Sequence, residues 1–256
     1  MTQEQWQIFC DFKKDFKQAI DEWSVYSEKL MVFQKGAALA AKNPLYSFET
    51  PLVYNKALDE ITPQDDIKLI VIGDNPGKDE QLKKNNRYLV GQAGKIAQGY
   101  FEKNSELGID FRKNVIILNK TPVHSAKTSQ LKFIEKSGGP EIAGLLEKTQ
   151  IWMAEKTARL HIDLNQAVSK AERPVELWLV GYSELKEKGI FEKYKTCLKT
   201  AYEKLSPESW NEVYVFQHFS MNRFSIDLKD HFKEKESLLE NIHRLGSLHK
   251  QEIFGL

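Results

Sequence analysis

Residues 67–77 read IKLIVIGDNPG, and this stretch decides how the rest of the chain is interpreted. Its first six residues are apolar except for Lys68, and they do not alternate with polar residues. Such a run is typical of a strand that is buried on both faces of a parallel sheet. Gly73, Pro76 and Gly77 then favour a tight turn in which the backbone approaches a ligand closely. The stretch predicts a parallel strand whose carboxyl end carries a candidate binding loop.

Three more apolar runs of four residues follow along the chain, at 115–118, 177–180 and 213–216. Helical patterns separate the runs, and one more follows the last run; these patterns cover 91–105, 139–168, 191–205 and 228–245. Alternating strands and helices imply right-handed crossover connections between parallel neighbours. We therefore predict an α/β protein, a three-layer α/β/α sandwich with a central four-stranded parallel sheet.

The N-terminal segment has a helical pattern of its own. Apolar residues recur at three- and four-residue steps between 3 and 34, which predicts one helix with its apolar face toward the core. Residues 43–63 contain three prolines and are expected to form an irregular connection. We interpret 1–256 as a single domain in which 1–45 is an N-terminal helical extension.

Composition narrows the class of protein. Apolar residues make up 41% of the chain, enough for a sizeable core, and 37 basic residues nearly balance 36 acidic ones. This balance argues against a strongly basic tail but leaves room for a local basic groove. We see neither a membrane span nor a secretory signal, so a soluble, cytoplasmic protein is expected. Cys10 and Cys197 form no Cys-x-x-Cys pair, which excludes a zinc or iron–sulfur site built from cysteines; no metal site is expected.

Polar side chains follow three of the predicted strands. Asn75 lies in the turn after the first strand, where its amide can orient a water. Asn119 ends the second strand, and its amide offers an acceptor and two donors that fit the edge of a nucleobase. His218 follows the last strand and can donate a hydrogen bond to a developing anion. Each residue alone also fits a plainer role in a turn, a cap or the core. Because parallel strands share a carboxyl edge, we expect the three to line one cleft.

Four motifs carry a resemblance to a known family. Residues 73–77 (GDNPG) match a G-x-N-P-G motif, and 115–119 (VIILN) match an apolar strand that ends in Asn. Residues 87–94 (RYLVGQAG) are similar to an R-P-F-V-G-P-A-G segment, and 218–220 (HFS) to an H-P-S motif. The motifs occur in the family's order and span most of the chain. On these residues the chain resembles the uracil-DNA glycosylase superfamily.

The resemblance implies a role for each matching position. Asn75 would position the attacking water, and Asp74 is its rival because the iron–sulfur branch of the family has an acidic residue at that position. Asn119 would read the edge of uracil. His218 would stabilise negative charge on the leaving base.

Other positions depart from the family pattern or complete the expected site. Leu89 stands where the iron–sulfur branch stacks a Phe on the base, and Tyr88 precedes it, so both are candidates for the base contact. The Gly77 amide and Ser220 are expected to bind flanking phosphates. The iron–sulfur branch's cysteines are absent, so no cluster or other cofactor is implied.

The implied activity is monofunctional hydrolysis of the N-glycosidic bond of uracil or a related damaged base in DNA, as in base excision repair. The base must leave the stack first, because a duplex shields the bond. DNA with such a lesion is the expected partner, and the protein is expected to be a monomer. Two alternatives stay open: a non-catalytic nucleic-acid-binding relative that keeps the pocket, and a small-molecule nucleotide or nucleoside hydrolase.

Overall fold

The central sheet has four strands. A computed structural model describes residues 1–167 and 173–255. The strands are β1 (Leu69–Gly73), β2 (Val115–Asn119), β3 (Glu176–Val180) and β4 (Val213–Phe216). They lie in the order β2-β1-β3-β4, and each neighbouring pair is parallel. Every strand residue is buried, which explains why the four runs are apolar without alternation.

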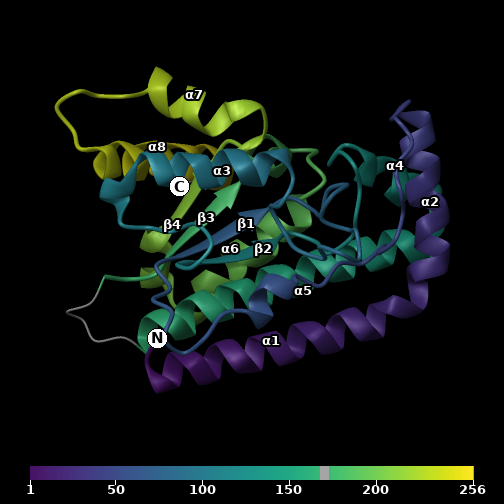
Figure 1. Ribbon diagram of the computed structural model, residues 1–256, viewed down its shortest axis with the longest axis horizontal. Coiled ribbons are helices and arrows are strands. Elements are labelled where there is room, and N and C mark those ends of the chain that lie inside the picture. The colour runs from purple at the N-terminus through teal and green to yellow at the C-terminus, as the bar shows by residue number, and fades with distance from the viewer. Residues whose placement is uncertain (168–172, 256) are drawn as a thin grey trace.

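Helices cover both faces of the sheet, so the predicted three-layer architecture is confirmed (Figure 1). One face packs against α3, α7 and α8, and the other against α5 and α6, with α1 outside α5. The eight α-helices of the described residues are α1 (Gln3–Trp23), α2 (Ser27–Ala40), α3 (Gln92–Lys103), α4 (Gln130–Ser137), α5 (Gly139–Gln166), α6 (Glu192–Leu205), α7 (Arg223–Asp230) and α8 (Leu238–Phe254).

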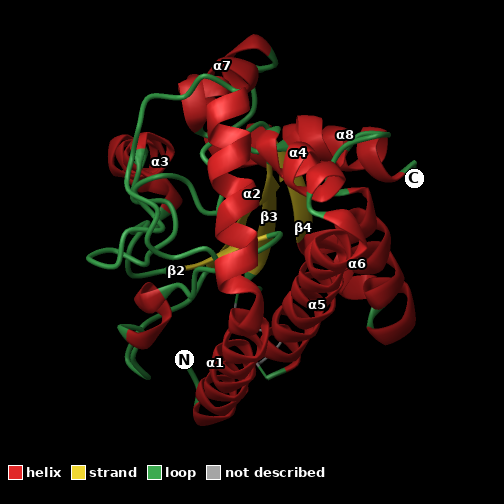
Figure 2. Cartoon of the chain, turned by 90° about the vertical axis from the view of Figure 1, so that its right-hand side faces the viewer, coloured by secondary structure: helices red, strands yellow, loops and turns green. Residues whose placement is uncertain are grey.

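The helix predicted over residues 3–34 is wrong in one respect, because it is broken. After α1 a short 3-10 turn, Ser24–Tyr26, redirects the chain into α2. The Ser24 hydroxyl donates to the Asp21 carbonyl at 2.6 Å, a local bond that competes with helix continuation. The two helices then have different neighbours, since α1 packs on α5 and α2 on α4. Seen from the end, α2 stands upright in front of the sheet (Figure 2).

The helix predicted over 228–245 is also wrong, because two helices, α7 and α8, occupy this part of the chain. Ser237 caps α8: it accepts from the Glu240 amide, and the Glu240 carboxylate accepts from the Ser237 amide. This reciprocal pair is a helix-start signal, and an unbroken helix over the same residues overlooks it. The short helix α4 was not predicted. The helix predicted over 139–168 ends at Gln166, and Val168 lies outside the described residues.

The N-terminal helices belong to the main hydrophobic core. Phe9, Phe16 and Trp23 of α1 are buried in the same cluster as residues of β1, β2, α5 and α6. The residues predicted as an extension therefore share the packing of the sheet. Within the described ranges, no helix combines the length and the apolarity needed to cross a membrane.

Candidate functional site

A pocket lies at the carboxyl edge of the sheet, where all four strands end. Its volume is about 640 Å³, and residues that end or follow each strand line it: Asp74 after β1, Asn119 of β2, Gly181 after β3 and His218 after β4. Ligands of open parallel sheets bind at this edge. Of the residues predicted from the sequence, seven line the pocket together: Asp74, Asn75, Gly77, Leu89, Asn119, His218 and Ser220. Tyr88 is the one that does not.

Asn119 lines this pocket, and its side-chain amide has a buried hydrogen-bond donor without a partner in the described part of the chain. The side chain is 1% exposed, and its Nδ2 atom has no partner among the described residues. A buried donor without an acceptor is unfavourable by about 1–3 kcal/mol. The arrangement is accounted for if a ligand supplies the acceptor, and a carbonyl oxygen on the edge of a planar base has the required chemistry.

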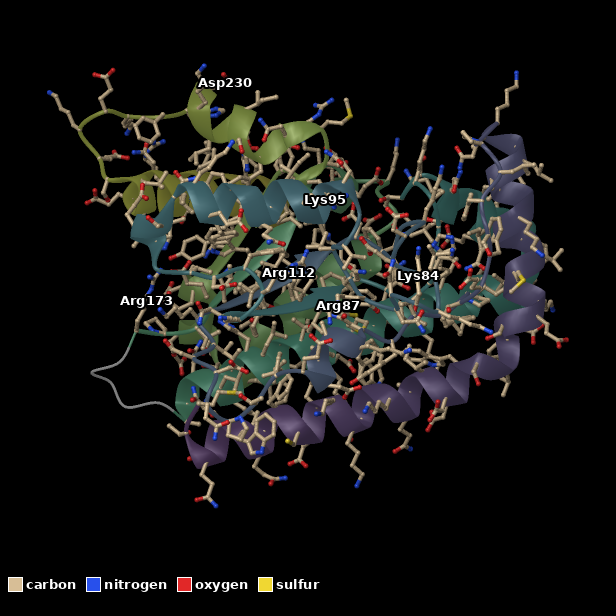
Figure 3. The ribbon with its side chains drawn as sticks, in the orientation of Figure 1. Lys84, Arg87, Lys95, Arg112, Arg173 and Asp230 are labelled. Carbon is tan, nitrogen blue, oxygen red and sulfur yellow. The ribbon has the colours of Figure 1, made fainter. Side chains whose placement is uncertain are left out.

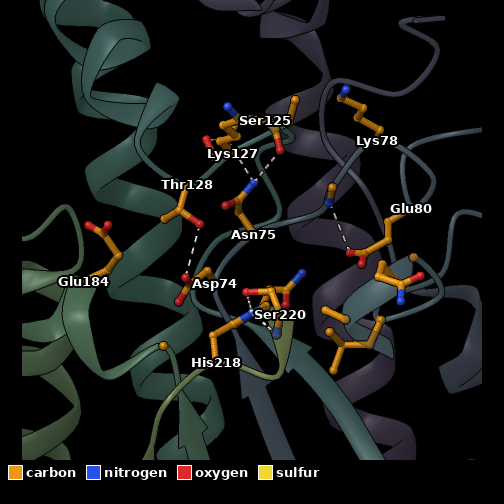
Figure 4. Close-up of a pocket in the computed structure, with 18 of the residues that line it drawn as sticks. Asp74, Asn75, Lys78, Glu80, Ser125, Lys127, Thr128, Glu184, His218 and Ser220 are labelled. Carbon is orange, nitrogen blue, oxygen red and sulfur yellow. Dashed lines mark hydrogen bonds between the residues drawn. The ribbon is translucent and has the colours of Figure 1, made fainter. Parts of the chain in front are cut away.

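Asn75 is held in a fixed orientation by the segment after β2 (Figure 4). Its Nδ2 atom donates to the Ser125 carbonyl and to the Ser125 hydroxyl, both at 3.0 Å. The turn itself is pinned by buried His124, whose Nδ1 lies 2.8 Å from the Pro76 carbonyl. With its amide protons directed to this segment, Asn75 offers its Oδ1 atom as an acceptor for a water.

Asp74 is restrained on three sides. Its Oδ1 atom lies 2.6 Å from the ammonium of Lys120, and its Oδ2 atom accepts a hydrogen bond from the Thr128 hydroxyl at 3.1 Å. Gly181, with a φ of 99°, closes the third side, since a Cβ there would collide with the carboxylate. The carboxylate is therefore a fixed negative charge in the pocket wall.

His218 is held by the loop that follows it. The Ser220 backbone N–H donates to Nδ1 at 3.1 Å, and the Ser220 hydroxyl lies 2.8 Å from the same atom. Because Nδ1 accepts, the neutral ring carries its proton on Nε2. Burial lowers the pKa of His218; the charge of Asp74 opposes this shift, and that of Lys120 adds to it. The ring is therefore a neutral donor at pH 7.

In the segment 87–94, Leu89 lines the pocket and Tyr88 does not. Tyr88 is fully buried, and its hydroxyl donates to the Val53 carbonyl at 2.5 Å. Leu89 adopts a φ of 50° and lines the pocket, while its carbonyl accepts from Arg112 at 2.6 Å. A Cβ at Gly94 would collide with that carbonyl, so glycine permits the close approach. The pocket wall at this position is aliphatic.

Glu80 engages the amide that the sequence assigned to phosphate binding. The Gly77 N–H donates to the Glu80 carboxylate at 3.2 Å, so this amide already has a partner. Burial raises the pKa of Glu80 to about 7, and the hydrogen bond from Gly77 opposes the shift. The other predicted phosphate ligand, Ser220, contacts His218 through its hydroxyl.

Lys120 and Thr128 are two of the site residues that sequence reasoning missed. Lys120 has no exposed surface, although a lysine after a strand is ordinarily expected at the surface. The available signal was its position directly after Asn119, where an unpaired charge would point into the predicted cleft. Thr128 lies in a loop whose path could not be inferred from the sequence.

The described residues contain no group of three or more His, Cys, Asp or Glu side chains arranged to hold a metal ion. No protein-family model, curated protein or solved structure matches this chain significantly. The chemistry of the pocket residues is therefore the basis on which a function is proposed.

Proposed function

We propose that this protein is a DNA glycosylase that hydrolyses the N-glycosidic bond of uracil or a related damaged base. One observation carries the proposal: a buried amide with an unpaired donor, a neutral imidazole and a restrained carboxylate meet in one pocket at the ends of separate strands. The motif resemblance to uracil-DNA glycosylases concerns these same residues. The pocket volume of about 640 Å³ is large enough for a base and its sugar.

Base recognition is assigned to Asn119. Its Nδ2 donates to O4 of uracil, and its Oδ1 accepts from N3–H. Cytosine has an acceptor at N3 and an amino group at position four. The same amide would therefore place a donor against a donor and an acceptor against an acceptor. Each mispaired buried group is unfavourable by about 1–3 kcal/mol. Two such mismatches disfavour cytosine by one to several powers of ten, at about 1.4 kcal/mol per tenfold change.

Departure of the base is assigned to His218. As the glycosidic bond breaks, the base takes the bonding electrons and becomes an anion. The Nε2–H of the neutral ring donates a hydrogen bond to a carbonyl oxygen of that anion, which stabilises the transition state more than the ground state. Ser220 keeps the ring in this tautomer through its backbone N–H.

Attack on the sugar is assigned to Asn75 and Asp74. The sugar carbon develops positive charge as the base leaves, as in other glycoside cleavages. The fixed carboxylate of Asp74 stabilises that charge, and Asn75 Oδ1 accepts a hydrogen bond from the water that attacks the carbon. The water adds to the sugar and loses its proton, and the departed base gains one, so the products are a free base and an abasic sugar.

DNA is expected to enter across the pocket rim. Lys78, Lys127 and Arg223 line the pocket, and their charges suit the phosphates on either side of a flipped nucleotide. Lys84 and Arg87, both labelled in Figure 3, follow Lys78 along the chain, but Arg87 already pairs with Glu60. Exposed Lys84 is therefore the better candidate for an additional backbone contact.

The test is release of free uracil from an oligonucleotide that contains one deoxyuridine, with enzyme in excess. The parent is expected to release uracil and His218→Gln to release it at least about 10²-fold more slowly, as when a transition-state donor is lost. The matched control is His231→Gln, because His231 is exposed; this variant should release uracil at the rate of the parent. Tight binding without base release from single-stranded or duplex substrate would refute catalysis and favour the non-catalytic relative.

A further inference from the structure

Lys120 is a buried lysine with three hydrogen-bond partners; burial lowers its pKa, and the charge of Asp74 opposes this shift. Its side chain has no exposed surface, and its ammonium contacts the Asp74 carboxylate at 2.6 Å, the Val180 carbonyl at 2.5 Å and the Gly73 carbonyl at 3.4 Å. The three acceptors come from the ends of β1 and β3, while Lys120 itself follows β2. The ammonium thus joins three strand ends directly beneath the pocket.

Stability of the fold alone does not explain this buried ion pair. A buried ion pair is often no better for stability than an apolar pair of similar volume, because both charges lose their hydration. Here one partner, Asp74, lines the cavity, and Lys120 contacts it from the buried side. The position of the pair therefore points to the chemistry of the pocket.

We propose that Lys120 is a positioning residue of this site, which acts through Asp74 and His218 and does not touch the base. Its ammonium orients the carboxylate toward the reacting sugar. Its positive charge also opposes protonation of the imidazole, which the carboxylate alone would favour. The inference rests on the proposed glycosylase function, because it concerns how the same pocket orients Asp74 and keeps His218 neutral.

Electrostatic balance at His218 is the measurable consequence. The charge of Asp74 raises the pKa of His218, and the charge of Lys120 lowers it, in addition to the lowering by burial. The other charged groups that line the pocket come from several elements and are left unchanged by the test: Lys78, Asp79, Glu80, Lys127, Glu184 and Arg223. Removing one member of the pair should therefore move the pKa of His218 in a predictable direction.

The experiment is an NMR titration of the imidazole C–H signals, in which His218→Gln identifies the His218 signal among those of the six histidines. Lys120→Met should raise the pKa of His218, and Asp74→Asn should lower it. Lys250→Met is the matched control, since Lys250 is also buried but donates to the Trp210 carbonyl at the other end of β4. It should leave the His218 titration unchanged.

A purely structural role predicts a different result. Lys120→Met would then lower the free energy of unfolding and leave the pKa of His218 where it is in the parent, and this outcome would overturn the proposal. If Lys120→Met does not fold, the double variant Lys120→Met/Asp74→Asn is compared with Asp74→Asn alone. The double variant should have the higher His218 pKa, and equal values would again overturn the proposal.

A kinetic measurement separates this inference from the proposed function. Lys120→Met should slow single-turnover uracil release by about 10²-fold, as expected when a catalytic group is misplaced by about 1 Å. In the Asp74→Asn background the same substitution should cause a smaller further loss, because only the effect of the lysine on His218 remains. Absence of base release by the parent protein would refute the glycosylase proposal, whereas the titration would still decide the role of Lys120.

Discussion

Replacement of Asn119 by leucine should stabilise the protein while removing its selectivity. Leucine branches at the same carbon as asparagine and has a similar shape, but it carries no polar atom. In the folded chain the Asn119 side chain is 1% exposed and its Nδ2 atom is unpaired. The substitution therefore removes an unsatisfied buried donor and breaks no hydrogen bond to Nδ2.

The size of the effect follows from that missing partner. An unsatisfied buried donor is unfavourable by about 1–3 kcal/mol, and part of this gain is offset by imperfect packing of the leucine. We expect the free energy of unfolding to rise by about 1 kcal/mol, which corresponds to an increase in Tm of about 2–4 °C for a chain of this size. Base release should fall by about 10²-fold, because two hydrogen bonds to the base are lost.

Asn55 provides a matched control with the opposite expectation. It is also fully buried, but its Nδ2 donates to the Ile117 carbonyl at 2.8 Å and its Oδ1 accepts from the Tyr88 N–H at 3.1 Å. Asn55→Leu leaves both of these backbone groups unpaired and should reduce stability by at least about 2 kcal/mol.

Thermal unfolding of the two variants beside the parent decides the matter. A higher Tm for Asn119→Leu and a lower Tm for Asn55→Leu are expected. If Asn119→Leu lowers Tm as much as Asn55→Leu does, then Asn119 is satisfied in the folded protein, and its assignment as the unpaired reader of the base is refuted.

Three further predictions test other parts of the site. Asn75→Ala should slow single-turnover base release far more than it weakens oligonucleotide binding, because a positioned water matters in the transition state; an unchanged rate, with activity lost in Asp74→Ala, would transfer this role to Asp74. Burial lowers the pKa of His124 from 6.5 to about 4, so its contribution to stability is complete above about pH 6.5 and is lost as the pH falls toward 4. In urea titrations, the free energy of unfolding of the parent should fall between pH 7 and pH 5. This fall should be about 2 kcal/mol smaller in His124→Gln, and an equal fall in both proteins would contradict this assignment. Met221, which is 76% exposed with a φ of 55°, lies next to the pocket residue Ser220. An exposed apolar side chain beside the pocket can insert between bases and help to flip one out of a duplex. Met221→Ser should therefore change stability by less than about 0.5 kcal/mol and slow base release from duplex DNA more than from single strands, and equal slowing would contradict this role.

The strands were predictable because each is buried on both faces. The run predicted at 213–216 has the bounds of β4, and the other three strands begin or end within two residues of the prediction. A parallel strand inside two helical layers contacts no water, so its whole length must be apolar. Helix boundaries were less predictable, since the apolar spacing continues across the break after Trp23, and the Ser237 cap of α8 lies inside the range predicted as one helix.

The pocket was predictable to the extent that it is made of strand ends. Asn75, Asn119 and His218 follow or end three parallel strands, and the topology alone brings such residues to one edge. The roles of Tyr88 and Lys120 were not predictable. Tyr88 is buried in the core, while Leu89 lines the pocket with a positive φ that no sequence pattern for leucine indicates. Lys120 is buried because three acceptors from distant segments converge on it.

The ammonium of Lys120 also has a consequence for the order of folding. Its acceptors lie 46, 47 and 60 positions away along the chain, and the Val180 carbonyl exists in place only after β3 has joined β1. An intermediate containing only β1 and β2 would have to leave this lysine in water, because burying a charge with an incomplete set of acceptors is strongly unfavourable. Closure of the pocket floor is thus coupled to docking of the third strand, and partly folded chains keep an open, hydrated floor in which Asp74 is not yet oriented.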